Sequence, residues 1–358
     1  MNTFGRLFRI TTFGESHGPG IGVVVDGLPG DIPIDLEAVA AALRRRRPGQ
    51  SEFTSPRKED DTVEVLSGLY RGRTTGAPLT LWIANRDPRP GEYEELARLY
   101  RPSHADYTYQ YKYRNPDPRG GGRSSARETA ARVAAGAIAE QFLRAQLPQL
   151  SILAWTASIG PYCTSYEPVS QEEVERSPVR CPDPELSLSM ENYLLHLKEV
   201  GDTTGGIIAA RVRGLPPGLG EPIYDKLSAR LAYAMLSINA AKGFEMGNGF
   251  ADTLLRGSEH NDQLIRSSEG QIRMATNKAA GVLGGISTGE DLCFRVAFKP
   301  IATIRQPQLT VTRQGEPTVL EARGRHDPCP VPRAVPIVEA MTALVLADFL
   351  LLARTTHS

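Results

Sequence analysis

The predicted strands of this chain follow one another mostly in hairpins, instead of alternating one by one with helices. Residues 7–12 and 22–26 read as two strands around the glycine-rich loop 14–20, and residues 309–320 read as a hairpin. A doubly wound parallel sheet requires strict strand–helix alternation. The pattern therefore predicts an α+β fold with antiparallel sheets.

Helical periodicity is clearest over residues 125–142, where small apolar residues such as Ala130, Ala134 and Ala137 recur on one face. So many alanines indicate close packing against another element. Asp35 predicts the N-cap of a helix ending at residue 46. We also expect helices over residues 190–200, 223–236 and 333–353, and strands over residues 63–70, 79–83, 151–157, 207–212 and 292–298.

The charge balance excludes a global electrostatic role. Lys plus Arg and Asp plus Glu both number 41 among 358 residues, so no net field attracts nucleic acid or an anionic membrane. Any anion must therefore be bound by a local cluster. The longest apolar stretch, 343–352, is interrupted by Asp348 and is too short to span a bilayer. The four cysteines lack disulfide or metal spacing, so we expect reduced thiols, no metal and a cytoplasmic protein.

A glycine-, arginine- and serine-rich segment, 120–128, directly precedes the predicted helix 125–142. Glycines let the backbone approach a ligand, and a helix N-terminus favours a phosphate or carboxylate. The alternative is a capping box formed by Ser125 and Glu128. Capping leaves Arg123 and Ser124 without a role, so we favour an anion site.

Other candidate groups lie in loops. His17 and His104 each lie in a glycine- or proline-flanked loop and could act as a general acid or base, although a lone histidine is more often structural. Asp327, beside Arg325 and His326, is either a base or an ion-pair partner. The arginine run 44–47 is typical of a solvated helix end. The chain has no P-loop and no Rossmann glycine motif.

Five segments together resemble the chorismate synthase family, in the family's order: TFGESHG at 12–18, RRRPG at 45–49, HADYTY at 104–109, GGRSSARET at 121–129 and GRHDPC at 324–329. The resemblance runs from residue 4 to about residue 352. It implies one catalytic domain over residues 1–358, with a helical layer sandwiched between two antiparallel four-stranded sheets, assembled as a homotetramer. It also implies a 1,4-anti elimination of phosphate from 5-enolpyruvylshikimate 3-phosphate that gives chorismate and requires reduced FMN without net redox change.

The same resemblance assigns roles to individual residues. His17 would protonate the departing phosphate, His104 would donate to the reduced flavin, and Asp327, relayed through Ser16 and Ser125, would handle the proton at the flavin N5. The substrate contacts would be Ser16, His17, Arg46, Arg47, Arg57, Arg101, Ala126, Arg127 and Arg325. The flavin contacts would be Arg123, Ser124, Ser125, Asn239, Ala240, Gly284, Lys299, Pro300, Ile301, Ala302, Thr303 and Arg325.

Three positions depart from the family pattern: Glu52 replaces a frequent basic residue, Lys278 a common His or Asn, and Ala280 a usual Gly. Glu52 weakens the case for an NADP contact near Arg46. No flavin reductase domain is inserted, so we expect a separate reductase or another source of reduced flavin. Whether NADPH is used directly stays open.

Two other functions are compatible with parts of the sequence. One is a flavin oxidoreductase that uses the same pocket for net hydride transfer. The other is an RNA-binding module that uses the arginine run 44–47 and Tyr107, Tyr109, Tyr111 and Tyr113 to stack on bases. Zero net charge and the lack of a recognised RNA-binding motif oppose the second.

Overall fold

The computed structural model describes residues 1–52, 54, 61–86, 98–114, 121–268, 270–322 and 327–356. Two five-stranded sheets dominate it, and every strand pair in them is antiparallel. The first sheet has the order β1 (Thr3–Phe4), β2 (Arg9–Gly14), β3 (Gly20–Asp26), β7 (Leu79–Ala84) and β4 (Val63–Ser67). The second has the order β11 (Ala241–Met246), β16 (Leu292–Phe298), β10 (Gly206–Arg213), β8 (Ser151–Ile159) and β9 (Tyr162–Cys163).

The expected α+β class with antiparallel sheets is confirmed, but the expected four strands per sheet is wrong. The additional strands are β1 and β9, which each have two residues and lie at an edge of their sheet. Strands of two residues are too short to show an alternating pattern in the sequence, so they are recognised only from their pairing with a neighbouring strand.

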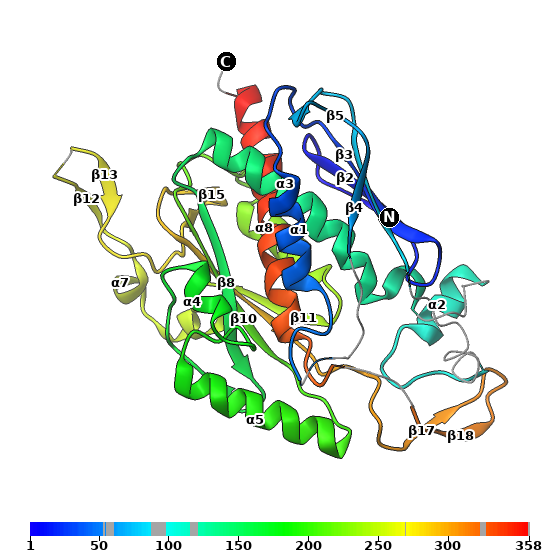
Figure 1. Ribbon diagram of the computed structural model, residues 1–358. Helices are drawn as coiled ribbons and strands as arrows, with labels where there is room; N and C mark the ends of the chain where they lie inside the picture. Colours follow the sequence, from blue (N-terminus) through cyan, green and yellow to red (C-terminus); the bar gives the residue numbers. More distant parts are fainter. Residues whose placement is uncertain are drawn as a thin grey trace.

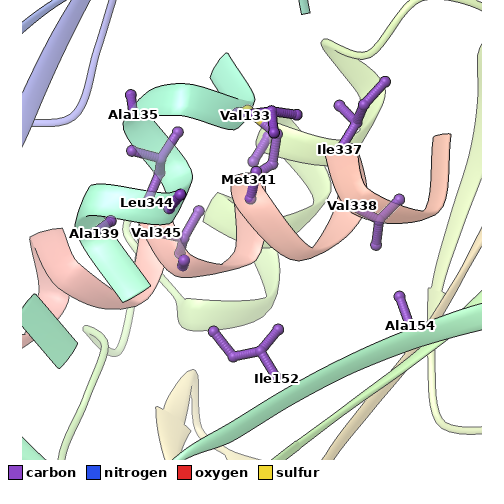
Figure 2. Close-up of a cluster of buried hydrophobic side chains, with 14 of the residues drawn as sticks. Val133, Ala135, Ala139, Ile152, Ala154, Ile337, Val338, Met341, Leu344 and Val345 are labelled. Atoms are coloured by element: carbon purple, nitrogen blue, oxygen red, sulfur yellow. The ribbon is translucent and has the colours of Figure 1, made fainter. Parts of the chain in front are cut away.

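Long helices lie between the two sheets (Figure 1). Helix α3 (Thr129–Gln146) contacts β3 and β7 of the first sheet, and α8 (Val331–Thr356) packs on β8 and β10 of the second. Helix α1 (Leu36–Arg46) contacts both α3 and α8, and Asp35 caps it by accepting a hydrogen bond from the backbone N–H of Glu37 at 2.8 Å. Figure 2 shows buried side chains of α3, α8 and β8 gathered in one cluster. The alanine-rich face therefore packs closely against another helix, as expected.

Helix α8 is long and apolar enough to cross a membrane by length and composition, yet it is mostly buried inside the protein and is a core helix. Asp348 is its buried acidic residue near the C-terminal end. Its carboxylate accepts hydrogen bonds from the backbone N–H groups of Arg6, Leu7 and Phe8 at 2.9, 2.7 and 3.0 Å. A buried charge satisfied in this way ties the turn before β2 to the core.

Several helix boundaries differ from the predictions. The helix predicted from residue 125 begins at Thr129, because residues before it form two 3₁₀ turns, η3 (Gly122–Ser124) and η4 (Ala126–Glu128). The helix predicted from residue 190 is α5 (Pro184–Val200), which begins earlier because Asp183 caps it, and the helix predicted from residue 223 is α6 (Leu227–Leu236). Helix α2 (Asp106–Tyr113) was not predicted; it has no buried residue and so no apolar face to mark it.

The remaining elements are short. They are β5 (Leu69–Tyr70), β6 (Arg73–Thr74), α4 (Gln171–Glu175), η5 (Gly249–Leu254), α7 (Gly257–His260), β12 (Leu264–Arg266), β13 (Ile272–Met274), β14 (Val282–Leu283), β15 (Ile286–Ser287), β17 (Gln308–Val311) and β18 (Pro317–Leu320). The last two form the hairpin expected within residues 309–320. All four cysteines are free thiols.

Candidate active site

The loop between β2 and β3 carries Ser16 and His17, whose side chains meet at 2.9 Å between Ser16 Oγ and His17 Nδ1. Asn85, the residue directly after β7, lies against this loop. Its side-chain amide donates to the carbonyl oxygens of Glu15, Ser16 and Gly18 at 3.0, 3.2 and 2.9 Å. The loop conformation is therefore fixed from the neighbouring strand.

Two arginines of the predicted substrate set share one buried carboxylate, that of Asp61. Arg46 Nη1 lies 3.1 Å from Asp61 Oδ2, and Arg127 Nη1 donates to Asp61 Oδ1. Arg127 Nε also donates to Asn85 Oδ1 at 3.0 Å. Arg46 is 1% exposed and further donates to Thr129 Oγ1 and to the carbonyl of Ala126. Arg46 thus acts within the protein interior and supports the segment that carries Arg127.

The glycine-rich segment before α3 is tied to β2 by Arg123. Its guanidinium donates to Thr12 Oγ1 at 2.6 Å and to the carbonyl of Gly14 at 3.2 Å. Ser125 Oγ accepts from the backbone N–H of Arg127 at 3.3 Å and so caps η4, whereas no side chain caps α3. The Glu128 carboxylate instead accepts from Thr12 Oγ1 and from Arg132. The alternative of a capping box between Ser125 and Glu128 at α3 is therefore wrong.

Three segments of the predicted flavin set are joined around Asn239. Asn239 Nδ2 donates to the carbonyl of Ser124 at 2.7 Å, and the next residue, Ala240, accepts from the backbone N–H of Lys299 at 2.9 Å. Lys299 Nζ donates to the carbonyl of Ser103 at 2.9 Å. Asn239 Oδ1 is buried and has no hydrogen-bond partner within the part of the chain that is described. An unpaired buried amide oxygen is costly and suits a ligand with an N–H or O–H donor.

The other predicted flavin contacts are placed as follows. Thr303, at the end of the loop that contains Pro300, Ile301 and Ala302, is buried. The carbonyl of Ile301 accepts from Thr203 Oγ1 at 2.8 Å. Gly284 lies in the turn between β14 and β15 with a φ of +58°. No hydrogen bond between described residues joins this turn to Asn239.

His104 lies two residues before α2, beside a carboxylate that also pairs with Arg101. Its Nδ1 is 2.8 Å from Asp106 Oδ1, and Arg101 Nε and Nη2 both donate to Asp106 at 2.6 Å. Burial raises the pKa of Asp106, but the hydrogen bonds and charges of His104 and Arg101 outweigh it and hold that pKa well below its usual value. The Asp106 carboxylate is thus placed beside His104 Nδ1, where it can orient the ring.

Asp327 is buried before α8, and its Oδ2 lies 2.5 Å from Nη1 of Arg333. Arg333 Nε in turn donates to the carbonyl of Arg46 at 3.2 Å. Asp327 is therefore an ion-pair partner of Arg333, and its role as a base stays a prediction. Arg47 is partly exposed at the end of α1. Arg57, Arg325 and His326 lie outside the described residues.

The arginine run 44–47 does not form a solvated face as a whole. Arg44 pairs with Glu37 on the exposed side of α1, but Arg45 pairs with Glu339 of α8 at 2.5 Å and with Glu175 at 2.8 Å. The positive charges of Arg45 and of the buried Arg46 are therefore paired within the protein. The run therefore does not present four solvated arginines on one face.

The three departures from the family pattern are also placed. The backbone carbonyl of Glu52 accepts from Lys198 Nζ, and Lys278 Nζ donates to the carbonyl of Glu259. Ala280 has a φ of +52°, a left-handed conformation that favours the glycine usual there. Within the described ranges, no group of three or more His, Cys, Asp or Glu side chains could hold a metal ion.

Asn85 and Asp61 were not identified from the sequence. Neither belongs to one of the five family segments, and the loop, arginine and carbonyl groups that they contact come from elsewhere in the chain. A family segment of several residues identifies the loop at residues 12–18, but no comparable segment identifies Asn85, which holds that loop.

Known proteins resemble the chain over nearly all of its length. The family model described as chorismate synthase matches residues 8–351. A chorismate synthase from Porphyromonas gingivalis is 56% identical over 358 residues, covering 99% of this chain and 97% of that protein. One from Opitutus terrae is 55% identical over 351 residues, covering 97% and 96%. A solved structure described as the crystal structure of chorismate synthase has a TM-score of 0.78 at 34% identity and covers 97% of this chain and 93% of that chain.

Proposed function

Because this chain belongs to the chorismate synthase family and is therefore a lyase, we propose that it eliminates phosphate from 5-enolpyruvylshikimate 3-phosphate with reduced FMN as cofactor. The observation that supports this most is the connection from Asp61 through Arg127 and Asn85 to the loop of Ser16 and His17. It brings a cation and a candidate acid together on a chain of zero net charge. That combination suits a substrate with one phosphate and two carboxylates.

The substrate anions are bound by arginines in this proposal. Arg127 and Arg101 present guanidinium groups that are already oriented by Asp61 and Asp106, respectively. Arg47 at the end of α1, with Arg57 and Arg325, would complete the set, and Ala126 would contribute its backbone. Arg46 supports the set from the interior through its hydrogen bond to the Ala126 carbonyl. Orientation before binding reduces the entropy lost when the substrate is fixed.

His17 is the proposed general acid. Its Nδ1 is engaged with Ser16 Oγ at 2.9 Å, so the ring is held in the loop by a neighbour that also contacts the phosphate in this proposal. A positioned acid gives its proton to the departing phosphate oxygen as the carbon–oxygen bond breaks. Such catalysis is typically worth ~10²–10⁴ in rate.

The residues around Asn239 fit a flavin. The unpaired Asn239 Oδ1 would accept from the cofactor, while Asn239 Nδ2 fixes the Ser124 backbone. Arg123, Ser124, Ser125, Ala240, Gly284 and the loop from Lys299 to Thr303, with Arg325, would complete the site. When bound, reduced FMN supplies the electron that promotes loss of phosphate and recovers it afterwards, so no net redox change results.

Two groups of the chain would hold protons near that cofactor. His104, with Nδ1 held by Asp106, would donate from its other ring nitrogen. Asp327 would accept the proton at the flavin N5 by way of Ser16 and Ser125. Its pairing with Arg333 holds the carboxylate in place before α8.

The broader setting belongs to the same proposal. Residues 1–358 would form a single catalytic domain that assembles as a homotetramer in the cytoplasm. Reduced flavin would come from a separate reductase, and neither nucleic acid nor a membrane would be a partner. The carbonyl of Glu52 accepts from Lys198 Nζ, and its acidic side chain, where a basic residue is frequent, does not favour direct use of NADPH near Arg46.

An anaerobic assay tests the proposed reaction. Purified protein is mixed with dithionite-reduced FMN and 5-enolpyruvylshikimate 3-phosphate, and phosphate and chorismate are followed together. Equal amounts of both, formed only with reduced FMN, support the proposal. Binding of flavin by folded protein without phosphate release would favour a flavin oxidoreductase instead.

A further inference from the structure

We propose that Asn85 is a positioning residue that fixes the loop of Ser16 and His17 relative to the anion-binding Arg127. This inference rests on the proposed function, because it assigns Asn85 a part in the same reaction. Asn85 itself touches neither the departing phosphate nor the cofactor in this account. It acts through the two groups that it joins.

The donor end of Asn85 holds the loop. Its amide nitrogen lies 3.0, 3.2 and 2.9 Å from the carbonyl oxygens of Glu15, Ser16 and Gly18. The backbone N–H of Asn85 donates to the carbonyl of Pro19 at 3.0 Å, and that of Gly18 closes the turn onto Glu15 at 3.2 Å. Three carbonyl dipoles that converge on one point repel one another unless a donor lies between them. The Asn85 amide is that donor.

The acceptor end of Asn85 holds the arginine. Asn85 Oδ1 accepts from Arg127 Nε at 3.0 Å, while Nη1 of Arg127 is paired with the buried Asp61. The guanidinium is therefore fixed from two sides, by one amide and one carboxylate. Asp61 anchors the guanidinium, and Asn85 links it to the loop.

Only a short side-chain amide meets both requirements at this place. Aspartate has the same shape and can accept from Arg127, but it has no hydrogen to offer the three carbonyls. Leucine has a similar volume and offers neither a donor nor an acceptor. Glutamine carries the same amide one methylene further from the backbone. The structure thus depends on the amide group and not on charge or volume.

Loss of Asn85 would change the position of His17 relative to the bound phosphate. The acid on the loop must meet the phosphate that the arginines bind, and a misplacement of about 1 Å can cost ~10² in rate. Loss of Asn85 leaves the Arg127–Asp61 pair in place, so substrate binding is largely retained while the acid is misplaced. The expected loss is therefore in kcat and not in KM.

Gln141, in the C-terminal part of α3, provides a matched control. Its side chain makes the same kind of two-ended contact, accepting from the backbone N–H of Asp35 at 2.7 Å and donating to the carbonyl of Asp35 at 3.0 Å. It holds the start of α1 and takes no part in the proposed reaction. A Gln141→Met variant removes a bridging amide without touching the loop.

The test compares Asn85→Leu, Asn85→Asp and Gln141→Met with the unmodified protein by steady-state kinetics and by hydrogen exchange of residues 14–20. We expect both Asn85 variants to lose at least ~100-fold in kcat with KM within about fivefold, and to exchange the loop amides faster. Gln141→Met should keep both kinetic constants and the loop protection.

Each outcome decides the inference separately from the proposed function. If the unmodified protein forms no chorismate, the proposed function fails, and faster loop exchange in both Asn85 variants still supports the structural half of the inference. If the unmodified protein is active and Asn85→Asp keeps its kcat and its loop protection, the inference is overturned. An equal kcat loss in Gln141→Met would also overturn it. The loss of any bridging amide, even one away from the loop, would then be enough to lower kcat.

Discussion

Gly136 of α3 lies directly against Ala340 of α8: a Cβ placed on Gly136 would lie 2.4 Å from the Cβ and 2.5 Å from the Cα of Ala340. In a helix interior, replacing glycine by alanine ordinarily stabilises by about 1 kcal/mol. Here the added methyl would push two core helices apart, and overpacking typically costs about 1–3 kcal/mol. We expect Gly136→Ala to lower the free energy of unfolding, measured by urea titration.

Gly257, at the start of the exposed helix α7, is the control for that substitution. A Cβ there meets no atom within 4 Å, so Gly257→Ala should leave the stability unchanged or slightly raised. A stable Gly136→Ala variant would show that α3 and α8 are not in direct backbone contact.

Arg45 forms an ion pair with the buried Glu339 that links α1 to α8, and it also pairs with Glu175. Removing Arg45 leaves the Glu339 charge buried, which typically costs about 3–5 kcal/mol, whereas Glu339→Leu leaves Arg45 paired with Glu175 and should cost less. We expect Arg45→Met and Glu339→Leu each to destabilise the protein, and the double variant to lose less than the sum, with a coupling of about 1–3 kcal/mol. Urea titration of all four proteins measures this cycle. Strict additivity would mean that the two residues do not interact.

The stability contributed by Asp106 should depend on pH. Its folded-state pKa lies below its unfolded value of about 3.9. The contribution is therefore present above that value and is lost as the pH falls through the folded-state pKa. Asp106→Asn should destabilise the protein at pH 7, and the difference from the unmodified protein should shrink below about pH 4. Urea titrations at pH 7, 5 and 3 measure it.

Asp31 is the matched control, because Arg73 also lowers its pKa but this pair is fully exposed. Asp31→Asn should have a smaller effect at every pH, since solvent screens exposed pairs. A pH-independent difference for Asp106→Asn would contradict the account of its ion pairs.

His17 and His104 should both be required for turnover. Replacing either by alanine should lower kcat at least ~100-fold with the fold intact, as expected for a lost general acid or donor. His196, on α5, is the control, and His196→Ala should keep its activity. Normal turnover of the His17→Ala or His104→Ala variant would remove that residue from the mechanism.

The parts of the fold that have a repeating apolar pattern were predictable. In the alanine-rich helix α3, apolar residues recur at helical spacing, and in strand β16 (Leu292–Phe298) buried residues alternate with more exposed ones. Both elements were located from the sequence. Helix α2 was missed because no residue of it is buried. Its tyrosines pair four residues apart, with Tyr107–Tyr111 and Tyr109–Tyr113 ring centroids at 4.8 Å. That spacing was a helical signal, although it was interpreted as a possible base-stacking surface.

The candidate site was predictable only where several of its residues are consecutive. The strings around His17 and Arg127 carry the family resemblance. Their partners Asn85 and Asp61 lie outside those strings, and only folding brings them to the loop and to the arginines. The same applies to Glu339, which pairs with Arg45 across 294 positions.

The most direct test of the central claim is a count of turnovers per flavin. Under strict exclusion of oxygen, a substoichiometric amount of dithionite-reduced FMN is added once to the protein with excess 5-enolpyruvylshikimate 3-phosphate, and chorismate, phosphate and the flavin spectrum are recorded. A lyase without net redox change predicts many equivalents of both products per flavin, with the flavin still reduced at the end. Product formation that stops at one equivalent per flavin, with the flavin oxidised, would contradict it.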